Sequence, residues 1–368
     1  MYNRATLNLG KTYNQGFILV ATLWILAILT IGAGYLAQWT DDALKHARQQ
    51  HTDLNSWLDI QDTLAVLRYL LGTYPLTEAG LMLPNPDAPF IAPTKRRNPF
   101  QRADSTGPAV KVDGNVYHGI GNALFSLQDE GGLIPANTHR LFLLKNWLGL
   151  KGIPVNQRDP LIARLEDYTD HDDLYRLNGA EKQQYIKSGE PSPPNRPLLT
   201  AGELAAVLGW KDQPNLWDPP STRRMVNTVW NAMPNLNTAP KIVLQSWHIF
   251  NSSEIDNIVT LRQIKPLLYV SDVRRLVGRK PALGPLDQRF IPSRYIRITL
   301  WSEHGPRARE IHLKLTPLVD KDKPWLIDYE LNFPISQLEH YTQPDKAISP
   351  LFDRNFMETN SASSRQLF

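Results

Sequence analysis

The residues best suited to chemistry form one acidic group within a short stretch of the chain. The group consists of Asp167, Asp170, Asp172, Asp173 and Glu181. Carboxylate oxygens concentrated in a loop are the ligands that Ca²⁺ prefers in proteins. The same acids could equally lie at helix ends and face solvent, and their spacing does not decide between the two interpretations. The sequence therefore offers a calcium site and a solvated acidic loop as alternatives.

No motif of an enzyme is present. The chain has no H-E-x-x-H, no G-x-S-x-G and no P-loop. It has no cysteine, which excludes disulfides, thiolate metal sites and cysteine nucleophiles. Its 40 lysines and arginines against 36 acids give a net charge of +4, which is too weak and too evenly spread for a nucleic-acid footprint. We expect a protein that is not an enzyme and does not bind nucleic acid.

The stretch from Phe17 to Ala37 contains no charged side chain. As a helix it would be about 31 Å long, close to the hydrocarbon thickness of a bilayer. Arg4 and Lys11 precede it, and no acid does. Positive charge on the short side predicts a cytoplasmic N-terminus and an exported remainder. The chain is expected to cross a membrane once, with its bulk on the exported side.

The apolar pattern continues beyond this stretch, at spacings of mostly three and four residues, as far as Leu71. Such spacing is typical of one face of an amphipathic helix and predicts a continuous helix over 17–71. A cleaved signal peptide is the alternative, but its apolar region is usually shorter. The residues 34–37 are also a poor cleavage site, and a signal peptide needs no amphipathic continuation.

The rest of the chain alternates between strand and helix patterns, which predicts an α+β fold with a helical domain inserted in it. The predicted segments are a proline-rich exposed connection over 75–108, a strand over 116–127 with a turn at 129–132, a helix-rich block over 137–278, a hairpin over 294–315 and a strand over 325–333.

The helical block contains an internal echo. PANTHRLFLLKNW, which includes Asn137, returns one hundred residues later as NLNTAPKIVLQSW, which includes Asn237. An Asn-Thr pair ahead of an apolar run predicts a helix N-cap. The echo fits a duplicated helical hairpin and two independent caps equally well.

The N-terminal residues resemble those of type IV prepilins and of the pseudopilins of type II secretion. The features they share are a basic leader, the pair Gly16-Phe17 and an apolar helix that becomes amphipathic. The resemblance implies that prepilin peptidase cuts after Gly16 and methylates the new N-terminal Phe17. Most members carry a glutamate at the fifth mature position, which here is Ala21. Its absence is typical of protein K, the largest minor pseudopilin.

The block LEDYTDHDDLYRLNGAEKQQYIKSGEPSPPNRPLLTAGELAAVLGW resembles the helical domain of type II secretion protein K. The matching residues are Asp170, Asp172, Asp173, Gly179, Ala180, Glu181, Tyr185, Asn195, Pro197, Leu198, Glu203, Leu204 and Gly209, and 235–240 resembles a later motif of that family. The resemblance implies a pseudopilin fold, with a long N-terminal helix, an antiparallel sheet and a large inserted helical domain. The implied parts are a cleaved leader over 1–16, a helix over 17–72, a pseudopilin domain over 73–128 and 281–342, an inserted domain over 129–280 and a disordered tail over 343–368.

By this resemblance the chain is expected to be a minor pseudopilin at the tip of the secretion pseudopilus, where it initiates or caps the fibre. The implied partners are the minor pseudopilins I and J, with H as a further one, and prepilin peptidase. The implied location is the bacterial inner membrane, crossed once, with the bulk of the chain in the periplasm. Family members bind calcium, which favours Ca²⁺ at the acidic group, although residues 182–184 are less acidic here than in relatives. The alternative is a bitopic membrane protein whose exported helical domain is an enzyme or a helix-hairpin-helix-like nucleic-acid-binding module.

Overall fold

The computed structural model describes residues 15–83, 108–139, 141–229, 234–282, 289–303, 305–316 and 324–338. Residues 1–14 of the expected leader over 1–16, most of the proline-rich connection and the expected tail over 343–368 lie outside these residues. The chain divides into two compact units, residues 1–55 and residues 56–368.

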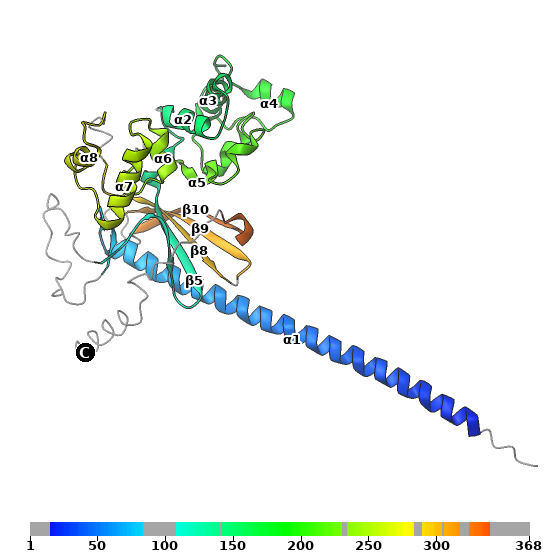
Figure 1. Ribbon diagram of the computed structural model, residues 1–368. Helices are drawn as coiled ribbons and strands as arrows, with labels where there is room; N and C mark the ends of the chain where they lie inside the picture. The colour runs from blue at the N-terminus through cyan, green and yellow to red at the C-terminus, as the bar shows by residue number, and fades with distance from the viewer. Residues whose placement is uncertain are drawn as a thin grey trace, which may run out of the picture. The chain divides into compact units, whose positions relative to one another are not determined.

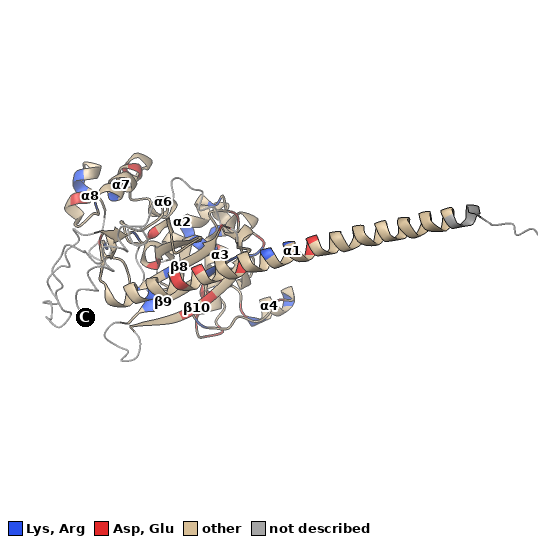
Figure 2. Ribbon diagram, turned by 90° about the horizontal axis from the view of Figure 1, so that it is seen from below, with Lys and Arg blue, Asp and Glu red and all other residues tan. Residues whose placement is uncertain are grey.

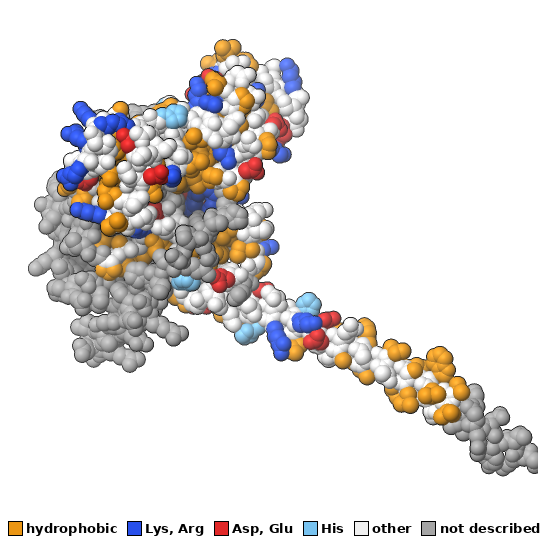
Figure 3. Space-filling model, in the orientation of Figure 1, with side chains coloured by type: hydrophobic (Ala, Val, Ile, Leu, Met, Phe, Trp, Pro, Cys, Tyr) orange, Lys and Arg blue, Asp and Glu red, His pale blue; other side chains and the backbone are white. Residues whose placement is uncertain are grey.

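Helix α1 runs without a break over Gln15–Thr73, which confirms the predicted continuous helix. In the first unit its large apolar side chains, from Leu19 to Leu36, are exposed (Figure 3). No Lys, Arg, Asp or Glu is coloured along this part of the helix, and charged residues begin further along it (Figure 2). Among the helices of the described residues, α1 is the one that is long and apolar enough to cross a membrane.

The second unit is built on a five-stranded antiparallel sheet in the order β10-β9-β8-β5-β4 (Figure 1). Its strands are β4 (Asp113–His118), β5 (Ala123–Asp129), β8 (Tyr295–Ser302), β9 (Arg307–Leu315) and β10 (Trp325–Pro334). Two smaller sheets flank it: β1 (Leu76–Thr77), β2 (Gly80–Met82) and β3 (Ala109–Val110) form one, and β6 (Ile134–Pro135) pairs in parallel with β7 (Val226–Asn227) in the other.

Two expectations about this region are wrong. The single strand predicted over 116–127 is the hairpin β4–β5, because Gly121 adopts a left-handed φ of 58°. Its turn is held by α1, where the Asp59 carboxylate accepts a hydrogen bond from the Asn122 N–H at 2.9 Å. The start of the proline-rich connection is not an exposed loop either, since it forms β1 and β2 and buries Leu81.

The last turns of α1 pack on one face of the sheet. Their periodic apolar residues meet the inward side chains of the strands, which explains why the predicted amphipathic stripe begins after the membrane segment. This core contains Ile60, Leu64, Leu67, Leu70 and Leu71 of α1 with Phe125, Leu127, Ile296, Ile298, Leu300, Ile311 and Leu313 of the sheet.

Between β5 and β8 the chain forms a helical segment with a separate hydrophobic core. Its helices are α2 (Phe142–Leu150), α3 (Val155–Thr169), α4 (Lys182–Ser188), α5 (Thr222–Met225), α6 (Lys241–Ser246), α7 (Ser252–Ile264) and α8 (Val270–Val277), with short 3₁₀ turns at Glu130–Gly132, Ala201–Ala206 and Pro214–Leu216. Trp147, Tyr185 and Trp210 are fully buried in its core. The antiparallel sheet, helix α1 and this helical segment together confirm the predicted α+β class.

The helical segment is joined to the sheet through Asp129, at the end of β5, whose side chain is completely buried. One carboxylate oxygen accepts hydrogen bonds from the N–H groups of Gly131 at 2.8 Å and Ser293 at 2.9 Å. The other accepts from the Thr238 hydroxyl at 2.8 Å and the Asn235 amide at 3.2 Å. Burial raises the pKa of Asp129, while these donors oppose that effect. A single side chain therefore ties β5, the loop before α6 and the entry to β8.

Glu130 continues the junction with a buried ionic network. Its Oε1 lies 2.5 Å from His312 Nδ1 and 3.3 Å from Arg297 Nε. His312 Nε2 lies 2.8 Å from Glu310 Oε1, and Glu310 also pairs with Arg224 of α5. Burial alone would raise the pKa of Glu310, but Arg297, His312 and Arg224 outweigh it and hold that pKa well below its usual range. The network links α5 to β8 and β9.

Lowering the pH should reduce the free energy of unfolding, because Glu310 becomes protonated more readily in the unfolded chain than in the folded one. Because its pKa is depressed in the folded state, its contribution to stability is present above the ordinary glutamate value of 4.5 and is lost as the pH falls below it. The substitution Glu310→Gln should therefore flatten the fall in unfolding free energy between about pH 6 and about pH 3.

Chemical denaturation of the full chain in detergent, repeated at each pH, measures this slope. The exposed Glu190 provides the matched control, and Glu190→Gln should keep the wild-type slope. A wild-type slope in Glu310→Gln would contradict the prediction.

Candidate functional site: the acidic loop of the helical segment

The acidic residues singled out in the sequence lie at the end of α3 and in the loop that leads to α4. Asp167, in the last turn of α3, is completely buried, whereas Asp172 and Asp173 are exposed. A Cβ atom at Gly179 would fall 1.9 Å from Asp167 Oδ2, so glycine is required where the loop passes over this carboxylate. The loop is therefore folded closely around Asp167.

Arg176 belongs to the same cluster, although its position in the sequence does not single it out. Its Nη1 donates to Asp167 Oδ1 at 2.8 Å and also to Asp170 Oδ2. Its backbone N–H donates to Asp167 Oδ2 at 3.3 Å. The hydrogen bonds to Asp167 and Asp170 raise the pKa of Arg176 above its ordinary value. The one signal in the sequence is an arginine placed among several acids.

Glu181 is only 5% exposed, and neither of its carboxylate oxygens has a hydrogen-bond partner. Asp170 Oδ1 and Asn195 Oδ1 are also buried without partners. Burial, followed by the negative charges of Asp167 and Asp170, raises the pKa of Glu181 to about 7. Buried oxygens without donors are costly, so these atoms are suited to a cation that is not part of the chain.

The five acids do not converge on one point while Arg176 is among them. Within the part of the chain that is described, no three His, Asp or Glu side chains lie close enough together to hold a metal ion. Asp172 Oδ1 instead accepts from the Leu174 N–H at 2.8 Å, and Asp173 Oδ1 from the Asn195 amide at 3.0 Å. The donor atoms suit Ca²⁺, but the guanidinium provides the positive charge of the cluster.

The repeated Asn-Thr pairs do not cap helices, so that prediction is wrong. The N-cap residues of α2 and α6 are Leu141 and Pro240. The amide of Asn137 instead donates to the carbonyls of Leu198 at 2.8 Å and Thr228 at 2.9 Å, and its Oδ1 accepts from the Leu198 N–H at 2.9 Å.

Asn237 repeats this arrangement. Its amide donates to the carbonyls of Leu267 and Phe290, both at 2.9 Å, and its oxygen accepts from the Leu267 N–H at 2.9 Å. Leu198 and Leu267 each stand in a Pro-Leu-Leu sequence, at 197–199 and 266–268. The echo in the sequence is thus a repeated hydrogen-bonding arrangement, which favours a duplicated unit over two unrelated caps.

The hairpin between α6 and α7 is poorly suited to phosphate. The Glu254 carboxylate accepts from the Asn251 N–H at 2.8 Å and binds Arg279 at 2.7 Å. An acid therefore lies at the start of α7, where a nucleic-acid-binding hairpin would present free N–H groups.

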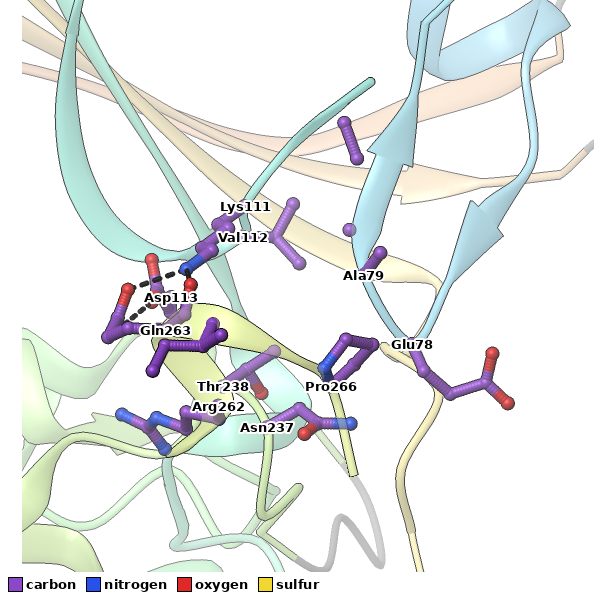
Figure 4. Close-up of a pocket in the computed structure, with 13 residues that line it drawn as sticks. Glu78, Ala79, Lys111, Val112, Asp113, Asn237, Thr238, Arg262, Gln263 and Pro266 are labelled. Carbon is purple, nitrogen blue, oxygen red and sulfur yellow. Dashed lines mark hydrogen bonds between the residues drawn. The ribbon is translucent and has the colours of Figure 1, made fainter. Parts of the chain in front are cut away.

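A cavity of about 280 Å³ lies between the β1–β2 hairpin and the end of α7 (Figure 4). Lys111 crosses it and donates to the Gln263 carbonyl at 2.7 Å and to Gln263 Oε1 at 2.6 Å. The Glu78 carboxylate points away from this contact (Figure 4). Lys111 and Gln263 thus form a further polar link between the strands and the helical segment.

These features define a class: an α+β protein with a long apolar N-terminal helix and a helical segment inserted between two strands of its sheet. The family model for type II secretion system (T2SS), protein K, matches residues 122–214, from the β4–β5 turn through the acidic loop. This match confirms the resemblance to protein K that the sequence motifs indicate, and the segment 122–214 belongs to that family.

No curated protein matches the chain. Among solved structures, the chain is similar to one in the crystal structure of the GspK-GspI-GspJ complex from the type 2 secretion system of enterotoxigenic Escherichia coli. The identity is 12%, the TM-score is 0.44, and the match covers 80% of this chain and 99% of that chain.

Removal of either asparagine amide should destabilise the helical segment. Asn237→Ala would leave the Leu267 N–H and two buried carbonyls without partners, at a cost of about 2–4 kcal/mol. Asn137→Ala should cost a similar amount, because it makes the same three bonds. Denaturant titration checks both, with the exposed Asn156→Ala as control. A loss no larger than that of the control would show that these bonds do not hold the repeated units.

Proposed function

We propose that this chain is a minor pseudopilin at the tip of the type II secretion pseudopilus, where it initiates or caps fibre assembly and supports export of folded proteins across the outer membrane. The observation that carries the proposal is the protein K match over residues 122–214. Beyond β5, that match lies in the inserted helical segment, the part that distinguishes this chain from a simple helix-and-sheet subunit.

The N-terminal helix supports a place at the end of a fibre. Subunits of such fibres pack their apolar helices side by side. A carboxylate buried in lipid is costly unless it is paired. In the pseudopilin family, the glutamate at the fifth mature position is understood to pair with the terminal amine of a neighbouring subunit. Ala21 has no carboxylate, so this subunit can offer nothing to the amine of another subunit. A subunit that lacks this carboxylate is suited to the end of the fibre.

Processing by prepilin peptidase provides a direct test of the proposal. The mature protein should begin at Phe17, because the peptidase cuts after Gly16, and its mass should include one N-terminal methyl group. Intact-mass spectrometry of protein purified from membranes measures both. The control is Gly16→Ala, which should leave the leader attached. A wild-type chain that begins at Met1 or beyond Ala37 would overturn the pseudopilin assignment.

The proposed partners are the minor pseudopilins I and J, with H as a further member of the fibre. We expect the tagged full chain, extracted in mild detergent, to purify with I and J when all three are co-expressed. A major pseudopilin co-expressed at the same level serves as the control and should be recovered in smaller amounts. Recovery of the chain alone would contradict a place in a tip complex.

The acidic loop is proposed to hold Ca²⁺. The residues proposed to hold the ion are those of the acidic group, with Asn195 as an added oxygen donor. Support comes from their hard oxygen atoms and from the buried Glu181, Asp170 and Asn195 oxygens that lack partners. The ion would neutralise the negative charge of the cluster.

A further inference from the structure

The acidic loop already contains one positive charge of its own. Arg176 Nη1 binds both Asp167 and Asp170, and its Nε lies 3.9 Å from Glu166 Oε2. One guanidinium thus faces three carboxylates, two of them in the proposed calcium-binding group. Any added cation has to compete with these contacts for the same oxygens.

The guanidinium does not satisfy the whole cluster. It leaves both oxygens of Glu181 and Oδ1 of Asp170 buried without a donor. Arg176 can donate from one planar fork only, whereas Ca²⁺ accepts six to eight oxygen ligands around one point. The arginine therefore occupies a cluster whose oxygens outnumber the hydrogen bonds it can supply.

In the loop between Asp170 and Gly179, the Arg176 side chain turns inward and binds Asp167 and Asp170, whereas its neighbours face solvent. Its neighbours Leu174, Tyr175 and Leu177 are 73%, 55% and 86% exposed. Apolar side chains this exposed contribute little to holding a loop in place. Polar contacts therefore hold the loop between Asp170 and Gly179. They are the contacts of Arg176, the bonds of Asn195 to Asp172 and Asp173, and the bond from the Leu174 N–H to Asp172.

We propose that Arg176 is a displaceable internal counter-ion, which must leave Asp167 and Asp170 before the acidic loop can take up Ca²⁺. The inference rests on the proposed calcium site and adds a competitor that sets its affinity. When the guanidinium leaves, its hydrogen bonds to Asp167 and Asp170 are lost. Binding of Ca²⁺ is therefore coupled to greater mobility of the loop segment that carries Leu174, Tyr175 and Leu177.

The test is a CaCl₂ titration of the full chain in detergent, followed by calorimetry, for wild type, Arg176→Gln and Arg176→Lys. Arg176→Gln should bind Ca²⁺ at least about tenfold more tightly than wild type, because the carboxylates lose their competitor. Arg176→Lys keeps the charge without the fork and should lie between them. Arg279→Gln removes a comparable Arg–Glu pair far along the chain and should bind like wild type.

Hydrogen exchange gives a second readout that does not depend on affinity. The backbone N–H groups of residues 174–177 should exchange faster in wild type after CaCl₂ is added, and faster in Arg176→Gln with or without it. Circular dichroism establishes that each variant is folded, and Arg176→Lys keeps the test valid if Arg176→Gln does not fold.

The outcomes separate the two proposals. Equal affinity of wild type, Arg176→Lys and Arg176→Gln would overturn the role of Arg176 while the calcium site stands. No binding by any variant would overturn the calcium site and this inference together. Tighter binding by Arg176→Gln that is abolished by adding Glu181→Gln would support both.

Discussion

The folded unit depends on one buried carboxylate whose hydrogen-bond donors, among the described residues, are all uncharged. Asp129 receives four hydrogen bonds from donors that come from the turn after β5, from the loop before α6 and from the approach to β8. A buried charge without donors would cost several kcal/mol, so these segments are required to be present together. The helical segment leaves the sheet beside Asp129 and returns beside it. This interaction therefore closes the insertion.

Glu130 adds a second constraint of a different kind. It belongs to a buried network in which two glutamates, two arginines and His312 pair with one another. Networks of this type tie elements in one arrangement, because removal of one member leaves the others unpaired. The apolar core of the helical segment and the core under α1 are separate. Polar residues thus link the helical segment to the sheet.

The sequence predicts those parts of the fold that periodicity controls. The membrane helix and its amphipathic continuation follow from hydropathy and from spacings of three and four, and the strands after residue 294 follow from alternation. The hairpin at residues 119–122 was missed because its glycines lie within an apolar run that also fits a single strand. Asn137 and Asn237 were misassigned because local rules favour helix caps, whereas their partners lie thirty or more residues away.

The candidate site shows the same limit. The acidic residues can be found by composition, but their arrangement cannot, because it is set by Arg176 and by the close approach of Gly179 to Asp167. The buried, unpartnered state of Glu181 is a tertiary property that no spacing rule contains. Proximity of the acids in sequence thus identified the loop, and only the folded chain places a guanidinium within it.

The most direct test of the central claim is the effect of Asp129→Asn on the full chain, measured by hydrogen exchange together with denaturant unfolding. An amide in place of the carboxylate would direct N–H groups at existing donors, which should cost about 2–4 kcal/mol of unfolding free energy. The account predicts this loss with faster exchange at residues 235–239 and near 293, while the exposed Asp212→Asn changes neither. Wild-type stability and protection in Asp129→Asn would contradict the claim that this carboxylate holds the helical segment on the sheet.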